Sequence, residues 1–93
     1  MQVHDTALVL VVGPDRDTQT ECDRWRGRGA VVMHAHDAGG CLRVATSVGP
    51  DLIVLDRRTP RRLVRLLRAH PVSAGARISW LQAAEPTVEP RAA

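Results

Sequence analysis

Several residue types that most domains use are missing from this 93-residue chain. It has no Phe, no Tyr and no Lys, so all 13 basic residues are Arg. The core must therefore be built from Val, Leu, Ile and Ala, with two Trp at most. No apolar run approaches the length of a membrane-spanning helix, and the N-terminus lacks the pattern of a signal peptide. We therefore predict a small cytoplasmic protein with no membrane association.

The chain also has few cysteines and a small net charge. Cys22 and Cys41 are the only cysteines, and their spacing is not that of a metal motif. Free thiols are the default for a cytoplasmic chain. The net charge of +3 permits an acidic partner or nucleic acid but indicates neither by itself.

Apolar runs alternate with amphipathic segments along the chain. Runs rich in β-branched and apolar residues predict strands at 7–12, 30–34, 52–55 and 77–81. Helical spacing and flanking Gly or Pro predict helices at 17–26, 37–48 and 60–70. This βαβαβαβ order implies a parallel sheet with right-handed crossovers.

The two later helices each carry an apolar face. In the first of them we expect Cys41, Val44, Ala45 and Val48 to face the core. In the second, the expected buried residues are Leu63, Leu66, Leu67 and His70.

The chain is organised around the third strand, which ends on an acid. Leu52, Ile53, Val54 and Leu55 form an unbroken apolar run, which is typical of a strand covered on both faces. Asp56 follows at the carboxyl end, where open α/β sheets place functional groups.

The next residues predict a helix start, with Thr59 as N-cap and Pro60 in the first turn. A purely structural alternative for Asp56 is an ion pair with Arg57, Arg58 or Arg77, or a cap on the following turn.

Residues 50–56 read Pro-Asp-Leu-Ile-Val-Leu-Asp, and Pro60 follows Asp56 by four positions. This pattern resembles the receiver domain of two-component response regulators, in which the final Asp accepts a phosphoryl group. The resemblance extends from about Ala7 to about Gln82. It implies an α/β, flavodoxin-like (CheY-like) three-layer parallel sheet with strand order 2-1-3-4.

A complete receiver has five strands, whereas this chain supplies four. We therefore expect a truncated receiver-like domain at 1–82 and a disordered tail at 83–93.

The family's chemistry depends on Mg²⁺ held by an acidic pair after the first strand and by the acceptor Asp. Carried over by position, Asp56 is the phosphoacceptor candidate. The acidic pair falls on Gly13 and Pro14, and Asp15, immediately after them, is the remaining candidate metal ligand beside Asp56, with Asp17 further along.

Two more of the family's site residues are missing. The family's Ser or Thr falls near Gln82, with Ser79 too early, and its Lys has no counterpart in this chain.

These departures favour a pseudo-receiver, meaning a signalling or adaptor module that acts through protein contacts without enzymatic activity and without a cofactor. The expected partner is another protein or a second copy, with a histidine kinase or other two-component protein as one class. The first alternative is a phosphorelay receiver that uses Asp56, and only this alternative requires Mg²⁺.

A dense arginine segment supports a further alternative, a small Arg-rich nucleic-acid-associated protein. No aromatic residue is interleaved for base stacking, so an acidic protein is the preferred partner and nucleic acid is not expected. The partner-binding candidates are Arg61, Arg65, Arg68, Ile78 and Trp80.

If the first helix alone covers one face of the sheet, Val9, Val11 and Val31 should be partly open to solvent. The fourth strand should then be an unpaired edge, and such surfaces mark interaction sites. We therefore expect a dimer or a docked complex rather than a free monomer.

His34, His36 and Asp37 form a His-x-His-Asp motif at the end of the second strand. Two His at this spacing point to one side of a strand, as in some zinc sites. The alternative is a solvated loop.

Overall fold

The computed structural model describes residues 7–14 and 16–81. Every predicted strand and helix is present, with ends shifted by two residues at most. The elements are β1 (Leu8–Val12), α1 (Arg16–Gly27), β2 (Val31–Ala35), α2 (Ala38–Val48), β3 (Leu52–Leu55), α3 (Arg62–Ala69) and β4 (Arg77–Trp80). Asp15, Gln82 and the tail expected at 83–93 lie outside the described residues.

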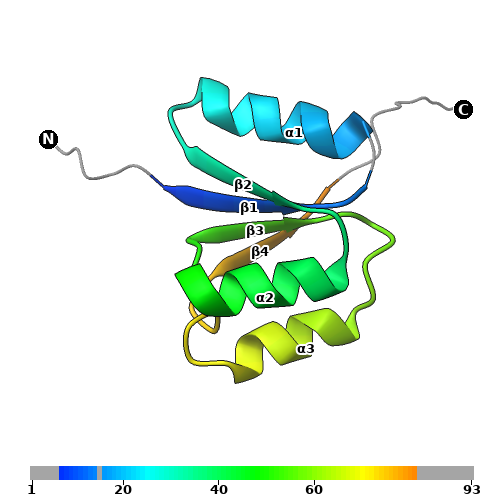
Figure 1. The fold of residues 1–93 in the computed structure, drawn as a ribbon, viewed down its shortest axis with the longest axis vertical. Coiled ribbons are helices and arrows are strands. Elements are labelled where there is room, and N and C mark those ends of the chain that lie inside the picture. Colours follow the sequence, from blue (N-terminus) through cyan, green and yellow to red (C-terminus); the bar gives the residue numbers. More distant parts are fainter. Residues whose placement is uncertain (1–6, 15, 82–93) are drawn as a thin grey trace, which may run out of the picture.

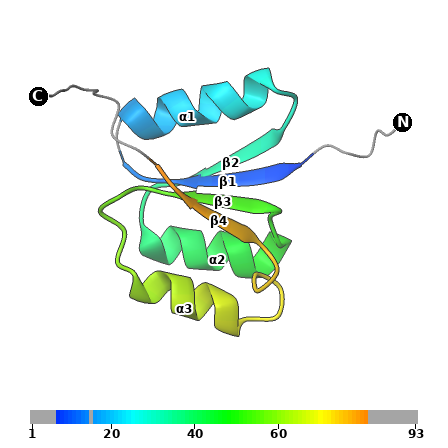
Figure 2. The ribbon, with the colours of Figure 1, turned by 180° about the vertical axis from the view of Figure 1, so that it is seen from behind.

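The sheet is entirely parallel, and its strand order is β2-β1-β3-β4, as predicted. Helix α1 covers one face, whereas α2 and α3 lie side by side on the other (Figures 1 and 2). Because all strands run the same way, the loops after β1, β2 and β3 gather at the carboxyl ends of the strands.

The apolar residues of the central strands divide between two hydrophobic clusters. In β1, Leu10 and Val12 pack toward α2 and α3, whereas Val9 and Val11 pack toward α1. All four are at most 1% exposed. An unbroken apolar strand is required because both of its faces are covered.

The α1 face is better covered than the sequence predicts. Val9 and Val11 are fully buried, so the expectation that they reach solvent is wrong. They lie in β1, between β2 and β3, and Cys22 of α1 packs against them with Trp25 alongside. Of these three valines, only Val31, on the edge strand β2, is exposed, at 53%.

Helix α3 begins at Arg62, two residues later than predicted, and its N-cap position is Arg61, which makes no side-chain cap hydrogen bond. Thr59 is therefore not the N-cap. Its N–H donates to the carbonyl of Asp56 (2.9 Å), which closes a turn directly after β3. Pro60 supplies the first carbonyl of the helical turn, accepting from the N–H of Leu63 (3.0 Å).

Two residues assigned to buried helix faces are exposed. Leu66 is 50% exposed, because the buried face of α3 is centred on Leu63 and Leu67, with Val64 beside them. Val48, 44% exposed, lies in the last turn of α2, just before Gly49 ends the helix in the left-handed conformation (φ 61°).

Both cysteines are free and buried, and they belong to clusters on opposite faces of the sheet, which agrees with the prediction of free thiols. Burial raises the pKa of the Cys41 thiol to about 11. Burial also raises the pKa of the Cys22 thiol, partly offset by the nearby Arg26 guanidinium.

Candidate functional site at the carboxyl ends of the strands

A small crevice of about 230 Å³ opens where β1 and β3 end. Its walls come from the loops after β1, β2 and β3, so the parallel topology assembles it from distant segments. The lining residues are Val12, Gly13, Pro14, His36, Asp37, Ala38, Asp56, Arg58, Thr59 and Pro60. The crevice therefore has the position that open α/β sheets use for binding sites.

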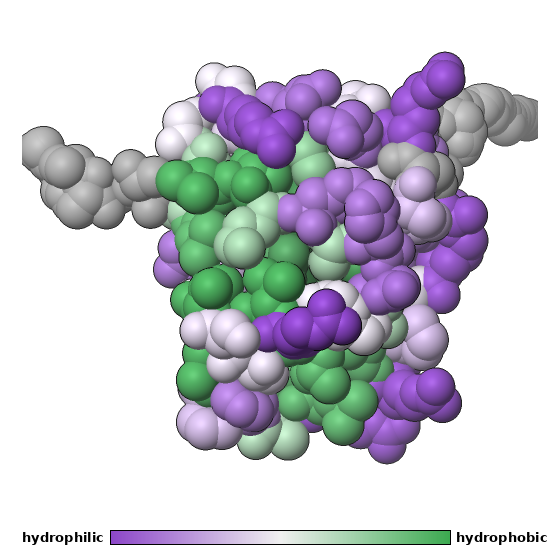
Figure 3. Space-filling model, in the orientation of Figure 1, coloured by the Kyte–Doolittle hydropathy of each residue, from purple (hydrophilic) through white to green (hydrophobic). Residues whose placement is uncertain are grey.

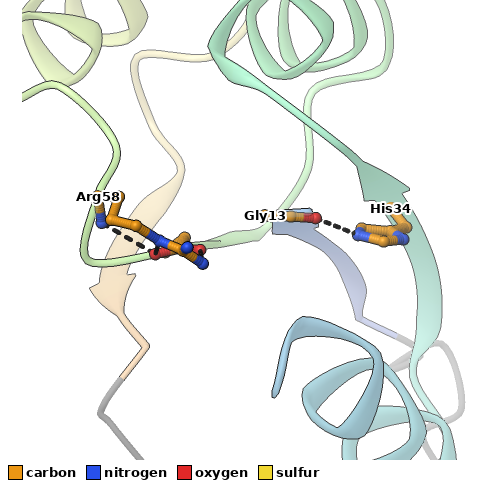
Figure 4. Close-up of polar contacts among 4 residues, drawn as sticks. Gly13, His34 and Arg58 are labelled. Carbon is orange, nitrogen blue, oxygen red and sulfur yellow. Dashed lines mark hydrogen bonds and ion pairs between the residues drawn. The ribbon is translucent and has the colours of Figure 1, made fainter. Parts of the chain in front are cut away.

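Asp56 stands in this crevice and is 6% exposed. Its carboxylate is held by Arg58 from the same loop, and Arg58 is labelled in Figure 4. Oδ1 accepts from the backbone N–H of Arg58 (2.9 Å) and from its Nε (3.2 Å), and Oδ2 accepts from Nη2 (2.7 Å). This bidentate geometry is the strongest form of a carboxylate–guanidinium pair. The structural alternative for Asp56 is confirmed in both parts, the ion pair and the turn cap.

Gly13 fills the space where the family resemblance expects an acid. Its φ is 154°, and a Cβ added there would overlap Oγ1 of Thr18 and lie 2.9 Å from Oδ2 of Asp56. Thr18 itself is fully buried. Even a methyl group therefore meets occupied space, and a carboxylate at this position would require the Thr18 and Asp56 side chains to shift.

These contacts bear on whether the crevice fits Mg²⁺, which needs several oxygen ligands. Position 13 offers no side chain, Pro14 has no oxygen on its side chain, and both carboxylate oxygens of Asp56 already accept from Arg58. Within 7–14 and 16–81, no group of three or more His, Cys, Asp or Glu residues could hold a metal ion. The described residues of the crevice do not fit a magnesium site.

The His-x-His-Asp motif lies at the other side of the crevice and is used for structure. The His34 and His36 rings lie on one side of the strand, with centroids 4.6 Å apart. Nε2 of His34 lies 2.7 Å from the Gly13 carbonyl, to which it donates (Figure 4). Oδ1 of Asp37 accepts from the N–H of Gly40 (2.8 Å) and caps α2. The motif therefore joins β1 to β2 and starts a helix.

The five partner-binding candidates form one surface, which we call the α3–β4 surface: Arg61, Arg65 and Arg68 on the α3 segment and Ile78 and Trp80 on β4. The Arg61 guanidinium lies over the Trp80 ring, 5.3 Å from its centroid. Nη1 of Arg68 donates to the carbonyls of Ala74 (2.9 Å) and Ala76 (2.7 Å). Ser79, on the same strand, does not line the crevice that holds Asp56; it lines a second cavity described next.

A groove of about 570 Å³ runs between α1 and the β3–β4 half of the sheet. Its lining is Ala7, Val9, Trp25, Asp51, Leu52, Arg77, Ile78 and Ser79. It exists because α1 is the only described helix on this face, whereas two helices cover the other (Figure 2). The sequence predicts the single helix but not where the resulting groove lies.

A further apolar area lies on the β2 side of the molecule. In the view of Figures 1 and 3, apolar side chains gather where the strands begin and α2 ends. The exposed Val31 and Val48 belong to these ends of β2 and α2. Among the described residues, no helix is both long and apolar enough to cross a membrane.

Comparisons with protein-family models, with curated protein sequences and with solved structures found no match for this chain.

Proposed function

We propose that this chain is a shortened, flavodoxin-like receiver domain that serves as a signalling or adaptor module through protein contacts, without efficient phosphotransfer. The resemblance of residues 50–56 to the receiver motif supports the family, and the parallel sheet of order β2-β1-β3-β4 is the arrangement that this family requires. A histidine kinase or another two-component protein is the partner class that the resemblance favours.

The observation that carries the non-catalytic part of the proposal is the state of Asp56. A phosphoacceptor must present a free carboxylate oxygen to the incoming phosphorus, and phosphoryl transfer needs positive charge on the phosphoryl oxygens. Here Arg58 binds both carboxylate oxygens, and Gly13 leaves no room for a second acid. The guanidinium thus neutralises the acceptor itself.

Arg58 also gives Asp56 a role without phosphorylation. A neutralised carboxylate joined to the loop of residues 57–61 fixes the path of the chain from β3 into α3. The position of α3, and with it the surface that α3 shares with β4, then depends on the same ion pair.

The proposal is tested by the intact mass of the protein after incubation with acetyl phosphate and Mg²⁺. We expect no phosphoryl adduct on the parent chain. The Asp56→Asn variant identifies nonspecific adducts, and Arg58→Ala reports whether Arg58 alone blocks the carboxylate. A stoichiometric adduct on the parent that Asp56→Asn removes would overturn the proposal and establish a phosphorelay receiver.

A further inference from the structure

We propose that the α3–β4 surface binds an extended acidic segment of a partner protein, which adds a strand to the open edge of β4. This inference rests on the proposed function, since it names the chemistry of the protein contact. Charge and backbone geometry at this edge both favour a negatively charged, extended peptide.

The charged Arg, Asp and Glu side chains of residues 57–81 all carry the same sign. Residues 57–81 contain no Asp or Glu, and they carry seven arginines: Arg57, Arg58, Arg61, Arg62, Arg65, Arg68 and Arg77. All seven are exposed, although the whole chain has a net charge of only +3. Only Arg58 has a described carboxylate partner in this set. A surface of one sign attracts and orients a partner of the opposite sign.

Two of these arginines are already held in place. Stacking on Trp80 positions Arg61, and two carbonyl acceptors position Arg68. Arg65 lies between them at helical spacing on the same side of α3. Side chains that are already fixed lose less conformational entropy on binding, so Arg61 and Arg68 are preorganised to bind carboxylates.

The backbone of β4 supplies the second half of the site. Arg77 donates its N–H to the carbonyl of Asp51, just before β3, and Leu81, just after β4, donates its N–H to the carbonyl of Leu55. In a parallel ladder the intervening residues, Ile78 and Trp80, point their N–H and C=O groups away from β3. No described strand pairs with that side of β4. An extended peptide would satisfy these groups by strand addition.

The spacing along the added strand is close to the spacing of the first two arginines. Alternate side chains of an added strand stand about 6.6 Å apart on one face of the sheet. Residues four and seven apart on a helix rise about 6 and 10.5 Å along its axis. Acidic residues at two alternate positions of the added strand would therefore meet Arg61 and Arg65, and a third would stand about 13 Å along, roughly 3 Å past Arg68.

Other occupants fit less well. Nucleic acid would gain from the arginines, but it does not use the paired N–H and C=O groups of a strand edge, and Arg61 already lies over Trp80, the one aromatic ring here. The opposite edge strand, β2, has the sequence Val-Val-Met-His-Ala and contains no arginine.

The test uses the full chain and a fluorescein-labelled peptide of four Thr-Glu repeats, with a Thr-Lys repeat as the charge control. Anisotropy measures affinity, and amide exchange followed by NMR reports on Ile78 and Trp80. We expect the Thr-Glu peptide alone to bind and to protect these two amides. Arg65→Glu should weaken binding about tenfold, whereas the same change at Arg43 on α2 should alter it less than twofold.

A pair of variants at one position tests strand addition directly. Ile78→Pro removes an outward N–H without removing a hydrogen bond to β3, whereas Ile78→Ala keeps that N–H and removes most of the side chain. We expect at least tenfold weaker binding for Ile78→Pro than for Ile78→Ala. If Ile78→Pro unfolds the chain, the comparison of Arg65→Glu with Arg43→Glu and the amide protection still decide.

Several results would overturn the inference. One is equal binding of both peptides; another is absence of binding, or binding without protection of Ile78 and Trp80. Tighter binding of a 20-nucleotide oligo(dT), lost on Arg65→Glu, would assign the surface to nucleic acid. Protection of the two amides without peptide would assign the edge to a second copy if sedimentation shows a dimer, or to residues 82–93 if it disappears on their deletion. All of these results are obtained with Asp56 and Arg58 unchanged, and none of them measures phosphorylation of Asp56, so failure here is distinct from failure of the proposed function.

Discussion

Replacing Arg58 with Ala should destabilise the chain by about 1–2 kcal/mol. The variant loses the two side-chain contacts to Asp56, at 3.2 Å from Nε and 2.7 Å from Nη2. It keeps the backbone N–H of position 58, which donates to Oδ1 at 2.9 Å. The turn after β3 is therefore retained, and the loss of stability reports on the guanidinium contacts alone.

The magnitude follows from the unequal exposure of the partners. The Arg58 side chain is 66% exposed, so solvent screens the attraction, and an exposed pair contributes up to about 1 kcal/mol. The Asp56 side chain is only 9% exposed, so losing its partner leaves a nearly buried carboxylate with fewer donors. That penalty brings the total toward about 2 kcal/mol.

The assay is urea unfolding at pH 7, with Arg57→Ala as the matched control, because Arg57 is exposed and makes no described ion pair. Arg57→Ala should change the free energy of unfolding by less than about 0.5 kcal/mol. A double-mutant cycle with Asp56→Asn should give a coupling energy near 1 kcal/mol that falls in 0.5 M salt. If Arg58→Ala is no more destabilising than Arg57→Ala, Asp56 is not held as described.

Three further predictions concern the core, the crevice and the thiols. Leu67→Ala should cost about 2–5 kcal/mol in urea unfolding because Leu67 is fully buried, whereas Leu66→Ala should cost less than about 0.5 kcal/mol; equal losses would contradict the assigned face of α3. Gly13→Ala should lower the thermal midpoint far more than Gly27→Ala, because an added Cβ meets buried atoms at the first position and none within 4 Å at the second; similar midpoints would refute the tight packing of the crevice. Cys41 has a folded-state pKa of about 11 against an ordinary value of 9.0. Between these pH values the unfolded chain therefore binds fewer protons than the folded chain. The free energy of unfolding should fall across this window by up to about 3 kcal/mol. The chain has no Lys or Tyr that would titrate in this range. If stability falls as steeply with pH in Cys41→Ala, beyond the smaller share from the Cys22 thiol, the Cys41 thiol is not buried as described.

The strands could be predicted because their apolar runs are short, unbroken and bounded by Gly or Pro, so local pattern and burial agree. The start of α3 could not. Thr59 and Pro60 have the propensities of a helix start, but the carbonyl of Asp56 takes the N–H of Thr59 into a turn, which delays the helix. A turn closed directly after β3 thus prevailed over the helix-start preference of Thr59 and Pro60.

At the candidate site, sequence patterns predicted which residues gather but not how they are engaged. The motif placed Asp56 at the end of β3, and three arginines were equal candidates for its partner until the loop geometry selected Arg58. The tight packing of Gly13 against Thr18 and Asp56 has no local signature, because it depends on how α1 crosses the end of β1. The row formed by Arg61, Arg65 and Arg68 was visible as helical spacing, but its neighbour Trp80 comes from a different strand.

The central claim is that Arg58 occupies the Asp56 carboxylate and that the described residues of the crevice do not form a magnesium site. An NMR titration with Mg²⁺ to about 20 mM, following the backbone amides of Gly13, Asp56 and Arg58, tests it most directly, since a millimolar site would saturate in this range. We predict small shifts that do not saturate and that are the same in Asp56→Asn. Saturating shifts at these three amides, lost in Asp56→Asn, would mean that the carboxylate exchanges Arg58 for the metal and would contradict the account.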